Sequence, residues 1–177
     1  MKKSTLGLLA IALLLGLTMG VAASCGGGKN QGNNAQAEAV WEDTSSGLMW
    51  QVGPTGGGMT RSSAFNHCDN LNYAGYSDWR LPSISELRTL ILGCDNTKTG
   101  GSCAVTDSCL SSGCWTSPCA GCVEGGCYWS SQIDGDCSWY WSSSPYTDIS
   151  GDVWIINFAD GSISNYNIGF NDVRCVR

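Results

Sequence analysis

The pattern of apolar and polar positions divides the chain into three zones. In the first, Lys2 and Lys3 precede an uncharged apolar run at 6–17. This run is shorter than the roughly 20 residues that a membrane-spanning helix needs, and its length is typical of the core of a signal peptide. We therefore expect residues 1–24 to be a secretory signal peptide.

The second zone, residues 25–39, contains no large apolar side chain and is rich in glycine, asparagine and glutamine. Such a segment buries too little surface to fold, so we predict a flexible tether with a reach of about 20 Å. Its first residue, Cys25, follows small residues at 21–24, and this junction resembles a bacterial lipobox, in which the cysteine is acylated. The alternative is ordinary cleavage near Ala23, which leaves Cys25 as an unpaired thiol.

The third zone, residues 40–177, begins with the pattern of a β-hairpin. Two short β-prone runs at 40–43 and 48–52 flank a polar turn at 44–47. The zone has about 138 residues, which is an ordinary size for one domain with its own core. We therefore predict a single folded domain that opens with this hairpin.

Two helices are predicted next. Thr60 can cap a helix in which Ala64, Cys68 and Leu71 recur at the spacing of one buried face. A second helix is predicted over 84–92, because a serine and a glutamate three residues apart form a capping box at its start.

The last third of the domain has the alternation of short strands. The tetrapeptide Tyr-Trp-Ser-Ser occurs twice, twelve residues apart, and an Asp-Gly pair at 160–161 has the composition of a tight turn. The pattern predicts strand-like segments at 128–131, 140–143, 153–158, 162–166 and 173–177. Two early helices, antiparallel hairpins and a cysteine-rich segment together indicate the α+β class.

Ten of the eleven cysteines lie in the domain, between Cys68 and Cys175. Export places the chain where thiols oxidise, so we expect these ten to form disulfides. Eight of them lie in an aperiodic insertion, residues 93–137, at Cys94, Cys103, Cys109, Cys114, Cys119, Cys122, Cys127 and Cys137. Eight cysteines allow many pairings, and the sequence does not choose among them.

A zinc site is the main alternative for these thiols. Cys119 and Cys122 have the spacing of a zinc ligand pair, but no second pair follows at a suitable distance and His67 is the only histidine. We therefore treat the pair as structural and expect neither a metal nor a cofactor.

Charge restricts the class of partner. Without the signal peptide, seven basic residues face fifteen acidic ones, a formal charge of −8. Nucleic acids need a basic surface, so they are excluded as preferred partners. Charged residues make up only 14% of the chain, and aromatic and short polar residues replace them. This composition is found in secreted binding surfaces, and equally in small disulfide-held domains without a ligand.

Four motifs occur in one order along the domain. They are Ser-Gly-Leu-Met-Trp-Gln at 46–51, Asp-Trp-Arg-Leu-Pro at 78–82, Tyr-Trp-Ser-Ser-Ser at 140–144 and Val-Arg-Cys-Val-Arg at 173–177. Together they resemble the Lcl C-terminal domain family of bacterial surface domains. The resemblance implies a variant of the C-type lectin-like fold, related to the formylglycine-generating-enzyme type. It also implies a disulfide between the first helix and the last strand, which joins Cys68 to Cys175.

The resemblance also indicates where a ligand would bind. Related folds place ligand contacts on loops and hairpins toward the C-terminal end, where aromatic and amide side chains suit stacking and hydrogen bonding. The candidate ligand-binding residues are Trp139, Tyr146, Asn165, Tyr166, Asn167 and Asn171. If the segment only holds the fold, about half of these are core residues.

Two other polar features have structural interpretations. Asn171 and Asp172 resemble part of the calcium motif of C-type lectins, but no second acidic loop motif accompanies them, so we expect a turn. Arg80 could bind an anion; we expect instead that it stacks on an aromatic ring or pairs with Asp78.

We predict a non-catalytic recognition domain that binds an extracellular glycan or protein. It would be held to the outer membrane or surface of a bacterial cell, with the lipid as its only membrane contact. The family's namesake is associated with adhesion to sulfated polysaccharide, whereas a charge of −8 favours a neutral glycan or a protein here. The alternatives are a structural envelope lipoprotein without a soluble ligand and, after it, an oxidative enzyme of the formylglycine-generating type, which needs free thiols.

Overall fold

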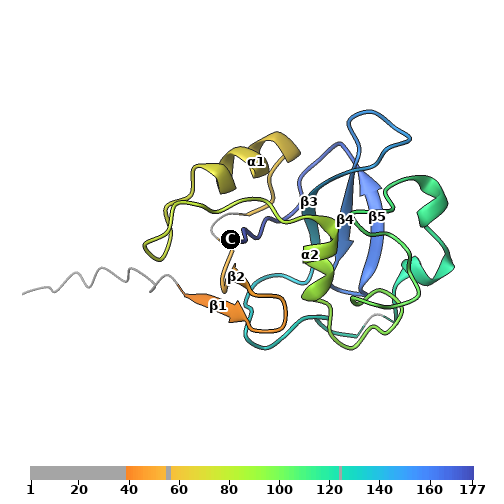
Figure 1. Cartoon of the computed structure of the whole chain (residues 1–177), viewed down its shortest axis with the longest axis horizontal. Coiled ribbons are helices and arrows are strands. Elements are labelled where there is room, and N and C mark those ends of the chain that lie inside the picture. Colours follow the sequence, from red (N-terminus) through yellow and green to blue (C-terminus); the bar gives the residue numbers. More distant parts are fainter. Residues whose placement is uncertain (1–38, 55–56, 124) are drawn as a thin grey trace, which may run out of the picture. The chain divides into compact units, whose positions relative to one another are not determined.

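The computed structural model describes residues 39–54, 57–123 and 125–177. Within these residues the chain has the predicted α+β architecture, with two small antiparallel sheets and two short α-helices (Figure 1). The predicted signal peptide and Cys25 lie outside the described residues. Among the helices that are described, none is long and apolar enough to cross a membrane.

The first sheet is the predicted hairpin. Strand β1 (Val40–Asp43) runs antiparallel to β2 (Leu48–Gln51), and Trp41 pairs with Trp50. The carboxylate of Asp43 holds the turn, because it accepts hydrogen bonds from the hydroxyls of the two turn serines, each at 2.6 Å. Trp50 is fully buried, so the hairpin is anchored to the core through its second strand.

Helix α1 (Arg61–Asp69) begins where predicted. The Thr60 side chain caps it by accepting a hydrogen bond from the backbone N–H three residues on, at 3.3 Å. Ala64 and Cys68 are fully buried on one face, as the spacing predicts. The prediction that Leu71 shares this helical face is wrong, because the helix ends two residues before it, although Leu71 still packs against the same core.

Helix α2 (Ile84–Thr89) opens with the predicted capping box. The Ser83 hydroxyl accepts from the Glu86 N–H at 3.2 Å, and the Glu86 carboxylate accepts from the Ser83 N–H at 2.8 Å. The predicted end at residue 92 is wrong. The chain leaves the helix early because its next residues pair elsewhere: the Leu92 N–H donates to the Tyr128 carbonyl at 2.9 Å.

The second sheet has three antiparallel strands in the order β3-β4-β5. The strands are β3 (Trp139–Pro145), β4 (Val153–Asn157) and β5 (Ser162–Tyr166). In the central strand, Ile155 pairs with Trp141 on one side and with Ser164 on the other. The register shifts between Trp141 and Pro145, which ends regular pairing in the second half of β3.

The expectation of a strand at 128–131 is wrong. Trp129 forms a single bridge, with Ile91, and no strand ladder continues from it. Its ring packs against Tyr140 and Phe158 with centroids 5.4 and 4.8 Å apart. The apolar pattern here therefore reflects burial of aromatic side chains rather than pairing in a sheet.

The predicted closing strand at 173–177 forms isolated bridges instead of a ladder. Val176 exchanges two backbone hydrogen bonds of 2.9 Å with Arg80, and it also bridges to β2. The segment thus joins the first hairpin to the chain before α2. A disulfide between Cys68 and Cys175 links it to α1, which is the pairing that the family resemblance implies.

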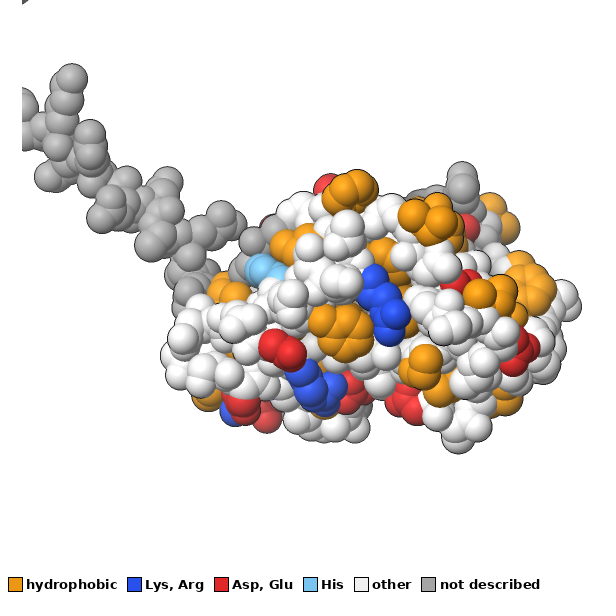
Figure 2. All heavy atoms as spheres, turned by 90° about the horizontal axis from the view of Figure 1, so that it is seen from above, with side chains coloured by type: hydrophobic (Ala, Val, Ile, Leu, Met, Phe, Trp, Pro, Cys, Tyr) orange, Lys and Arg blue, Asp and Glu red, His pale blue; other side chains and the backbone are white. Residues whose placement is uncertain are grey.

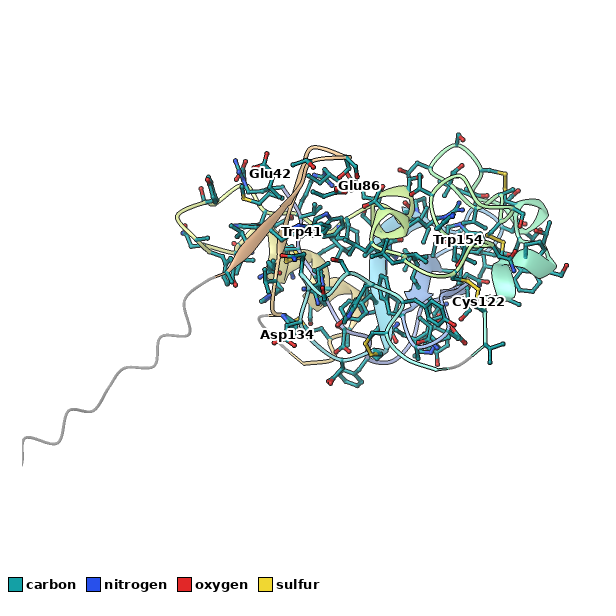
Figure 3. The ribbon with its side chains drawn as sticks, turned by 90° about the horizontal axis from the view of Figure 1, so that it is seen from below. Trp41, Glu42, Glu86, Cys122, Asp134 and Trp154 are labelled. Carbon is teal, nitrogen blue, oxygen red and sulfur yellow. A yellow bond between two sulfur atoms is a disulfide. The ribbon has the colours of Figure 1, made fainter. Side chains whose placement is uncertain are left out.

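The three-stranded sheet has a buried cluster on each face. Alternation along β3 and β4 places Tyr140, Trp154 and Ile156 in one cluster with α2 and the cysteine-rich insertion. Trp141 and Ile155 belong to the other cluster, with α1. Figure 3 shows the densely placed side chains around Trp154, with the disulfides of the insertion nearby.

The insertion at 93–137 is held by four disulfides among its own eight cysteines. The bridges are Cys94–Cys122, Cys103–Cys119, Cys109–Cys114 and Cys127–Cys137. Its short 3₁₀ helices are η1 (Ser112–Cys114) and η2 (Ser117–Ala120). The Trp115 indole donates to the Ile163 carbonyl at 2.7 Å, so the insertion covers part of the otherwise open edge of β5.

Candidate functional site

The candidate site is a pocket on the face of the three-stranded sheet that also packs against α1. Alternation brings Trp139, Ile155 and Ser164 to this face, since Ile155 pairs with Ser164 and with Trp141, which lies two residues from Trp139. Tyr166 lies two residues beyond Ser164 and continues the row. All three strands therefore contribute to the floor of the pocket.

The chain that follows β5 forms the wall of the pocket. It returns to the sheet at Asp172, whose N–H donates to the Trp139 carbonyl at 2.8 Å. One residue earlier, Asn171 exchanges backbone hydrogen bonds of 2.8 and 3.1 Å with Met59. These contacts hold the segment 169–171 beside the floor residues.

Gly169 is required in this wall by its backbone conformation. Its φ angle is 96°, which L side chains rarely adopt. A Cβ at this position would also lie 3.4 Å from the Tyr166 ring. The glycine therefore lets the chain turn back while the tyrosine ring stays close to it.

The pocket has a volume of about 410 Å³. Sites for small molecules commonly span about 300–1,000 Å³ and combine apolar walls with a few polar groups. The lining has this composition, with Trp139, Ile155, Ser164, Asn165, Tyr166, Gly169, Phe170 and Asn171. The pocket therefore has room for one sugar ring or a comparable group.

No acidic or basic side chain lines this pocket among the described residues. The side chains that can form hydrogen bonds there carry two amides, a hydroxyl, a phenol and the indole N–H of Trp139. The Asn165 amide donates to the Asp152 carboxylate at 2.7 Å, so one of the two amides is already engaged. Figure 2 shows one face of the molecule, on which hydrophobic side chains are scattered and both acidic and basic groups are present. The site therefore offers stacking and neutral hydrogen bonds rather than charge pairing.

The second amide has no such partner. Asn171 is 9% exposed, and its Nδ2 is buried without a hydrogen-bond partner among the described residues. An unpaired buried donor costs about 1–3 kcal/mol. The described residues contain six buried side-chain nitrogen or oxygen atoms of this kind, so the unpaired amide does not by itself mark a ligand contact.

Comparison with known proteins identifies the domain. The family model of the Lcl C-terminal domain matches residues 39–177. The chain belongs to the Lcl C-terminal domain family. The matched range includes the cysteine-rich insertion and every residue of the pocket. No curated protein matches the sequence.

In this Lcl C-terminal domain, the structure brings four of the six candidate ligand residues together. The four that line the pocket are Trp139, Asn165, Tyr166 and Asn171. Tyr146 lies elsewhere, because its ring packs against Trp154 with centroids 5.1 Å apart, in the cluster on the opposite face of the sheet. Asn167 is exposed and lies outside the lining.

Four lining residues were missed by sequence reasoning. They are Ile155, Ser164, Gly169 and Phe170. Alternation from Tyr166 points to Ser164, but only the strand register places Ile155 beside it. Phe170 is 73% exposed, and a large exposed aromatic side chain next to a candidate amide is a signal that could have been used.

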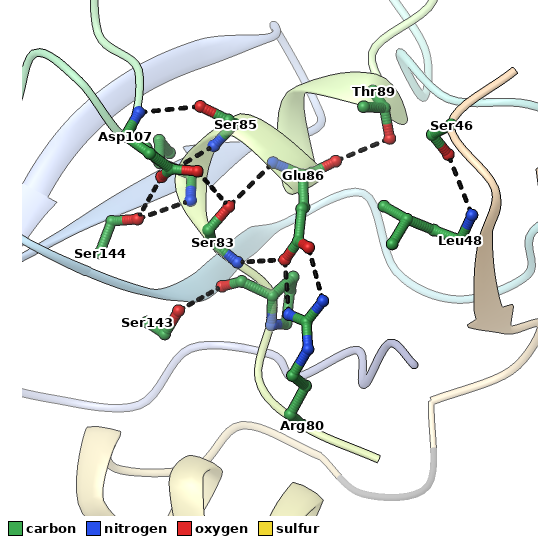
Figure 4. A network of polar contacts seen from close by, with 12 residues as sticks. Ser46, Leu48, Arg80, Ser83, Ser85, Glu86, Thr89, Asp107, Ser143 and Ser144 are labelled. Carbon is green, nitrogen blue, oxygen red and sulfur yellow. Dashed lines mark hydrogen bonds and ion pairs between the residues drawn. The ribbon is translucent and has the colours of Figure 1, made fainter. Parts of the chain in front are cut away.

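The expected partner of Arg80 is wrong. Arg80 forms a bidentate ion pair with Glu86, at 2.6 and 2.7 Å (Figure 4). Asp78 pairs instead with Arg177. Burial of Glu86 raises its pKa, but the hydrogen bonds from Arg80 and from the Ser83 N–H outweigh this effect and the pKa lies below its usual value. Arg80 therefore serves to fix the start of α2, and its guanidinium already has an anionic partner.

Asp107 carries the other polar network near α2. Its carboxylate accepts from the hydroxyls of Ser83 and Ser144 at 2.6 and 2.8 Å (Figure 4). Ser83 precedes α2 and Ser144 lies in β3, so the network ties the insertion to both. These side chains therefore use one another as hydrogen-bond partners and stabilise the fold.

The turn expected at Asn171 and Asp172 is wrong, since both residues form isolated β-bridges, with Met59 and Tyr140 respectively. The Asp172 carboxylate accepts from the Ser138 hydroxyl. Within the described ranges, no group of three or more His, Cys, Asp or Glu residues is placed to hold a metal ion. His67 lies on α1, outside the pocket lining, and burial lowers its pKa.

Proposed function

We propose that this Lcl C-terminal domain is a non-catalytic recognition module that binds an extracellular glycan or protein through the pocket beside β5. The pocket itself carries the proposal, because aromatic rings and amides converge there and none of the described residues adds a charged group. Rings stack on the C–H faces of sugars and on apolar side chains, and amides supply directed hydrogen bonds. The pocket thus has the means to hold a ligand and orient it.

The lining supports binding rather than catalysis. General acid–base catalysis needs a group that exchanges protons near neutral pH, and nucleophilic catalysis needs an activated nucleophile. The pocket contains amides, a phenol and one serine, and no imidazole, carboxylate or thiol lines it in the described residues. A thiol-dependent oxidase also lacks support, because the ten cysteines from Cys68 to Cys175 form five disulfides.

The placement of the domain in the cell envelope belongs to the same proposal. A signal peptide at 1–24, a lipid on Cys25 and a short tether would hold the domain near an outer membrane or cell surface. At that distance a module with a formal charge of −8 would be repelled by anionic polymers. Neutral glycans and proteins are therefore the ligands we expect.

A glycan and protein array with the mature, oxidised protein tests the proposal. The variants Phe170→Ala and Tyr166→Ala remove exposed rings from the pocket, so each should reduce any binding at least tenfold while the fold is kept. Val123→Ala is the matched control, since Val123 is 84% exposed and outside the lining. If binding is unchanged in both pocket variants, the pocket is not the binding site. If no ligand binds, the result favours the structural envelope lipoprotein.

A further inference from the structure

The pocket continues into an exposed apolar segment. Tyr166, Ile168 and Phe170 alternate along one stretch of chain and are 48%, 73% and 73% exposed. The sequence has no charged residue from 161 to 171. Single exposed apolar side chains are common on protein surfaces, whereas apolar surface that is contiguous with a pocket is typical of an interaction site. The segment therefore enlarges the candidate binding surface beyond the pocket itself.

The exposed ring of Phe170 stands on a fixed backbone. The next residue, Asn171, exchanges two backbone hydrogen bonds with Met59. A Cβ at Gly58 would lie 3.3 Å from the Cβ of Phe170, so the chain packs closely against the base of this side chain. A group whose backbone is already ordered loses less entropy on binding. Phe170 is therefore suited to form one wall of a binding site.

The floor of the pocket combines an aliphatic surface with one hydroxyl. Ile155 and Ser164 are cross-strand partners on the same face of the sheet, and both line the pocket. Ser164 is partly exposed, and its hydroxyl is not one of the buried unpaired side-chain atoms of the described residues. This hydroxyl is therefore accessible to a ligand as a donor or as an acceptor.

These features favour a protein over a sugar as the ligand. A sugar ring carries several hydroxyls, and each of them needs a partner when it is buried. The amide nitrogen of Asn165 already donates to Asp152, and that of Asn171 is buried, so neither is open to a ligand. The aliphatic side chains of Ile155 and Ile168 are suited to the apolar groups of a polypeptide.

An aromatic side chain fits the pocket on both counts. Its ring buries a large apolar surface against Ile155 and Phe170, and contact between two rings adds stabilisation beyond the buried area. Tyrosine fits better than phenylalanine, because its hydroxyl can pair with that of Ser164. Aromatic residues seated in pockets commonly contribute much of the binding energy at protein interfaces.

The charge of the domain restricts the partner further. A formal charge of −8 attracts basic partners and repels a second copy of the same chain. We propose that the pocket holds an aromatic side chain, tyrosine in preference to phenylalanine, from a basic segment of a protein partner. The exposed segment 166–170 packs against the apolar residues next to this anchor. This inference deepens the proposed recognition function and rests on it.

Short peptides that differ in one feature provide the test. The reference probe is the capped pentapeptide Gly-Lys-Tyr-Lys-Gly, titrated into the mature, oxidised protein and followed by NMR. Replacement of its tyrosine by alanine should weaken binding at least tenfold, because burial of an aromatic side chain is lost. Replacement by phenylalanine should weaken binding about two- to tenfold, through loss of one hydrogen bond.

Two further probes test the charge and the class of ligand. Replacement of both lysines by glutamate should weaken binding at low salt, and the difference should shrink as salt is added. Cellotriose is the neutral glycan probe, and it should bind at least tenfold more weakly than the reference peptide.

Variants assign the binding to the proposed residues. Phe170→Ala should weaken the reference peptide at least tenfold and keep the melting temperature, since this side chain is 73% exposed. Ser164→Ala should make the tyrosine and phenylalanine peptides bind equally. Val123→Ala is the matched control and should change neither result, because Val123 is 84% exposed and outside the lining.

The outcomes separate this inference from the proposed function. Equal affinity for the tyrosine and alanine peptides, or a preference that persists in Phe170→Ala, overturns the aromatic anchor and leaves the recognition function standing. Equal affinity for the lysine and glutamate peptides at low salt overturns the basic partner, and a tyrosine preference that survives in Ser164→Ala overturns the role of that hydroxyl.

The remaining outcomes concern other occupants of the pocket. Cellotriose that binds as tightly as the reference peptide overturns the choice of a protein. Sedimentation of the protein alone that shows a dimer, which Phe170→Ala dissociates, overturns the basic partner and places a second copy at the pocket. If no probe binds, the inference is refuted, and the proposed function then depends on whether any ligand on the array requires Phe170.

Discussion

Loss of the disulfide between Cys68 and Cys175 should destabilise the domain more than loss of a bridge inside the insertion. The perturbation is Cys68→Ala with Cys175→Ala, and the matched control is Cys109→Ala with Cys114→Ala. Each double variant removes one disulfide and no charge. The two bridges differ in sequence separation, which is 107 residues for the first and 5 for the second.

The magnitudes follow from the chain entropy of the unfolded state. A bridge that closes a longer loop removes more conformations from that state, so its loss costs about 5 kcal/mol for the first pair and about 2 kcal/mol for the second. Cys68 and Cys175 are both fully buried, so lost packing adds to the larger value. Since domains are commonly stable by about 5–15 kcal/mol, the first variant approaches the limit of folding.

The assay is equilibrium unfolding in urea, followed by tryptophan fluorescence. The free energy of unfolding should fall by about 3 kcal/mol more in the first double variant than in the control. A thermal melt should show a corresponding gap of roughly 10 °C. Equal losses in the two variants, or a larger loss in the control, would contradict the view that the long bridge closes the fold while the short one acts locally.

Three further changes test the contacts that hold the insertion and α2 in the fold. Gly121→Ala places a Cβ 2.6 Å from the Asp160 carbonyl oxygen at a φ of 89°. Urea unfolding should therefore show that the free energy of unfolding falls by about 2–4 kcal/mol. A change near zero would show that the insertion does not pack tightly against β5. Ser83→Ala removes the cap of α2 and should lower the free energy of unfolding by about 1–2 kcal/mol; an unchanged thermal melt would contradict this. Glu86→Gln should flatten the dependence of stability on pH: the folded-state pKa of Glu86 lies below 4.5, so its contribution is complete above that value and is lost as pH falls through the folded pKa. The free energy of unfolding should be measured between about pH 5 and 2. If it falls as much in this variant as in the wild-type protein, the role of the ion pair with Arg80 is refuted.

Local elements were the most accessible to sequence reasoning. The capping box at Ser83 and the cap at Thr60 are confirmed, because each depends on a side chain and a backbone N–H only three residues apart. The hairpin of β1 and β2 is confirmed for the same reason, since the carboxylate of Asp43 and its two serines fix the turn within a few residues. Interactions of this range involve residues that are close together in the sequence, so a local sequence pattern can predict them.

The wrong predictions concern segments whose conformation depends on distant partners. Residues 128–131 have a strand-like pattern, yet Trp129 is held by aromatic packing against Phe158 and by a single bridge. Arg80 had an acidic neighbour two residues away, but Asp78 pairs instead with Arg177 at the end of the chain, and Arg80 pairs with Glu86 on the first turn of α2. In both cases the sequence correctly indicated that the side chain is engaged in the fold, but it did not indicate which residues it contacts.

The candidate site shows the same division. The family resemblance indicated aromatic and amide residues near the C-terminal end, and Trp139, Asn165, Tyr166 and Asn171 do line one pocket. Nothing in the sequence distinguishes Tyr146 from them, since it is equally aromatic and lies only seven residues after Trp139. The register of β3 with β4 and β5 decides which side chains share the pocket.

The sequence by itself determined the local elements, the oxidised state expected of ten cysteines and the acidic charge balance, because each of these is a property of nearby residues or of composition. The tertiary structure alone decided the pairing of the eight cysteines in the insertion, the placement of that insertion on the edge of β5 and the closure of the pocket by residues 169–171. These depend on which strands lie side by side, and contacts between residues far apart in the chain carry no signature in a single sequence.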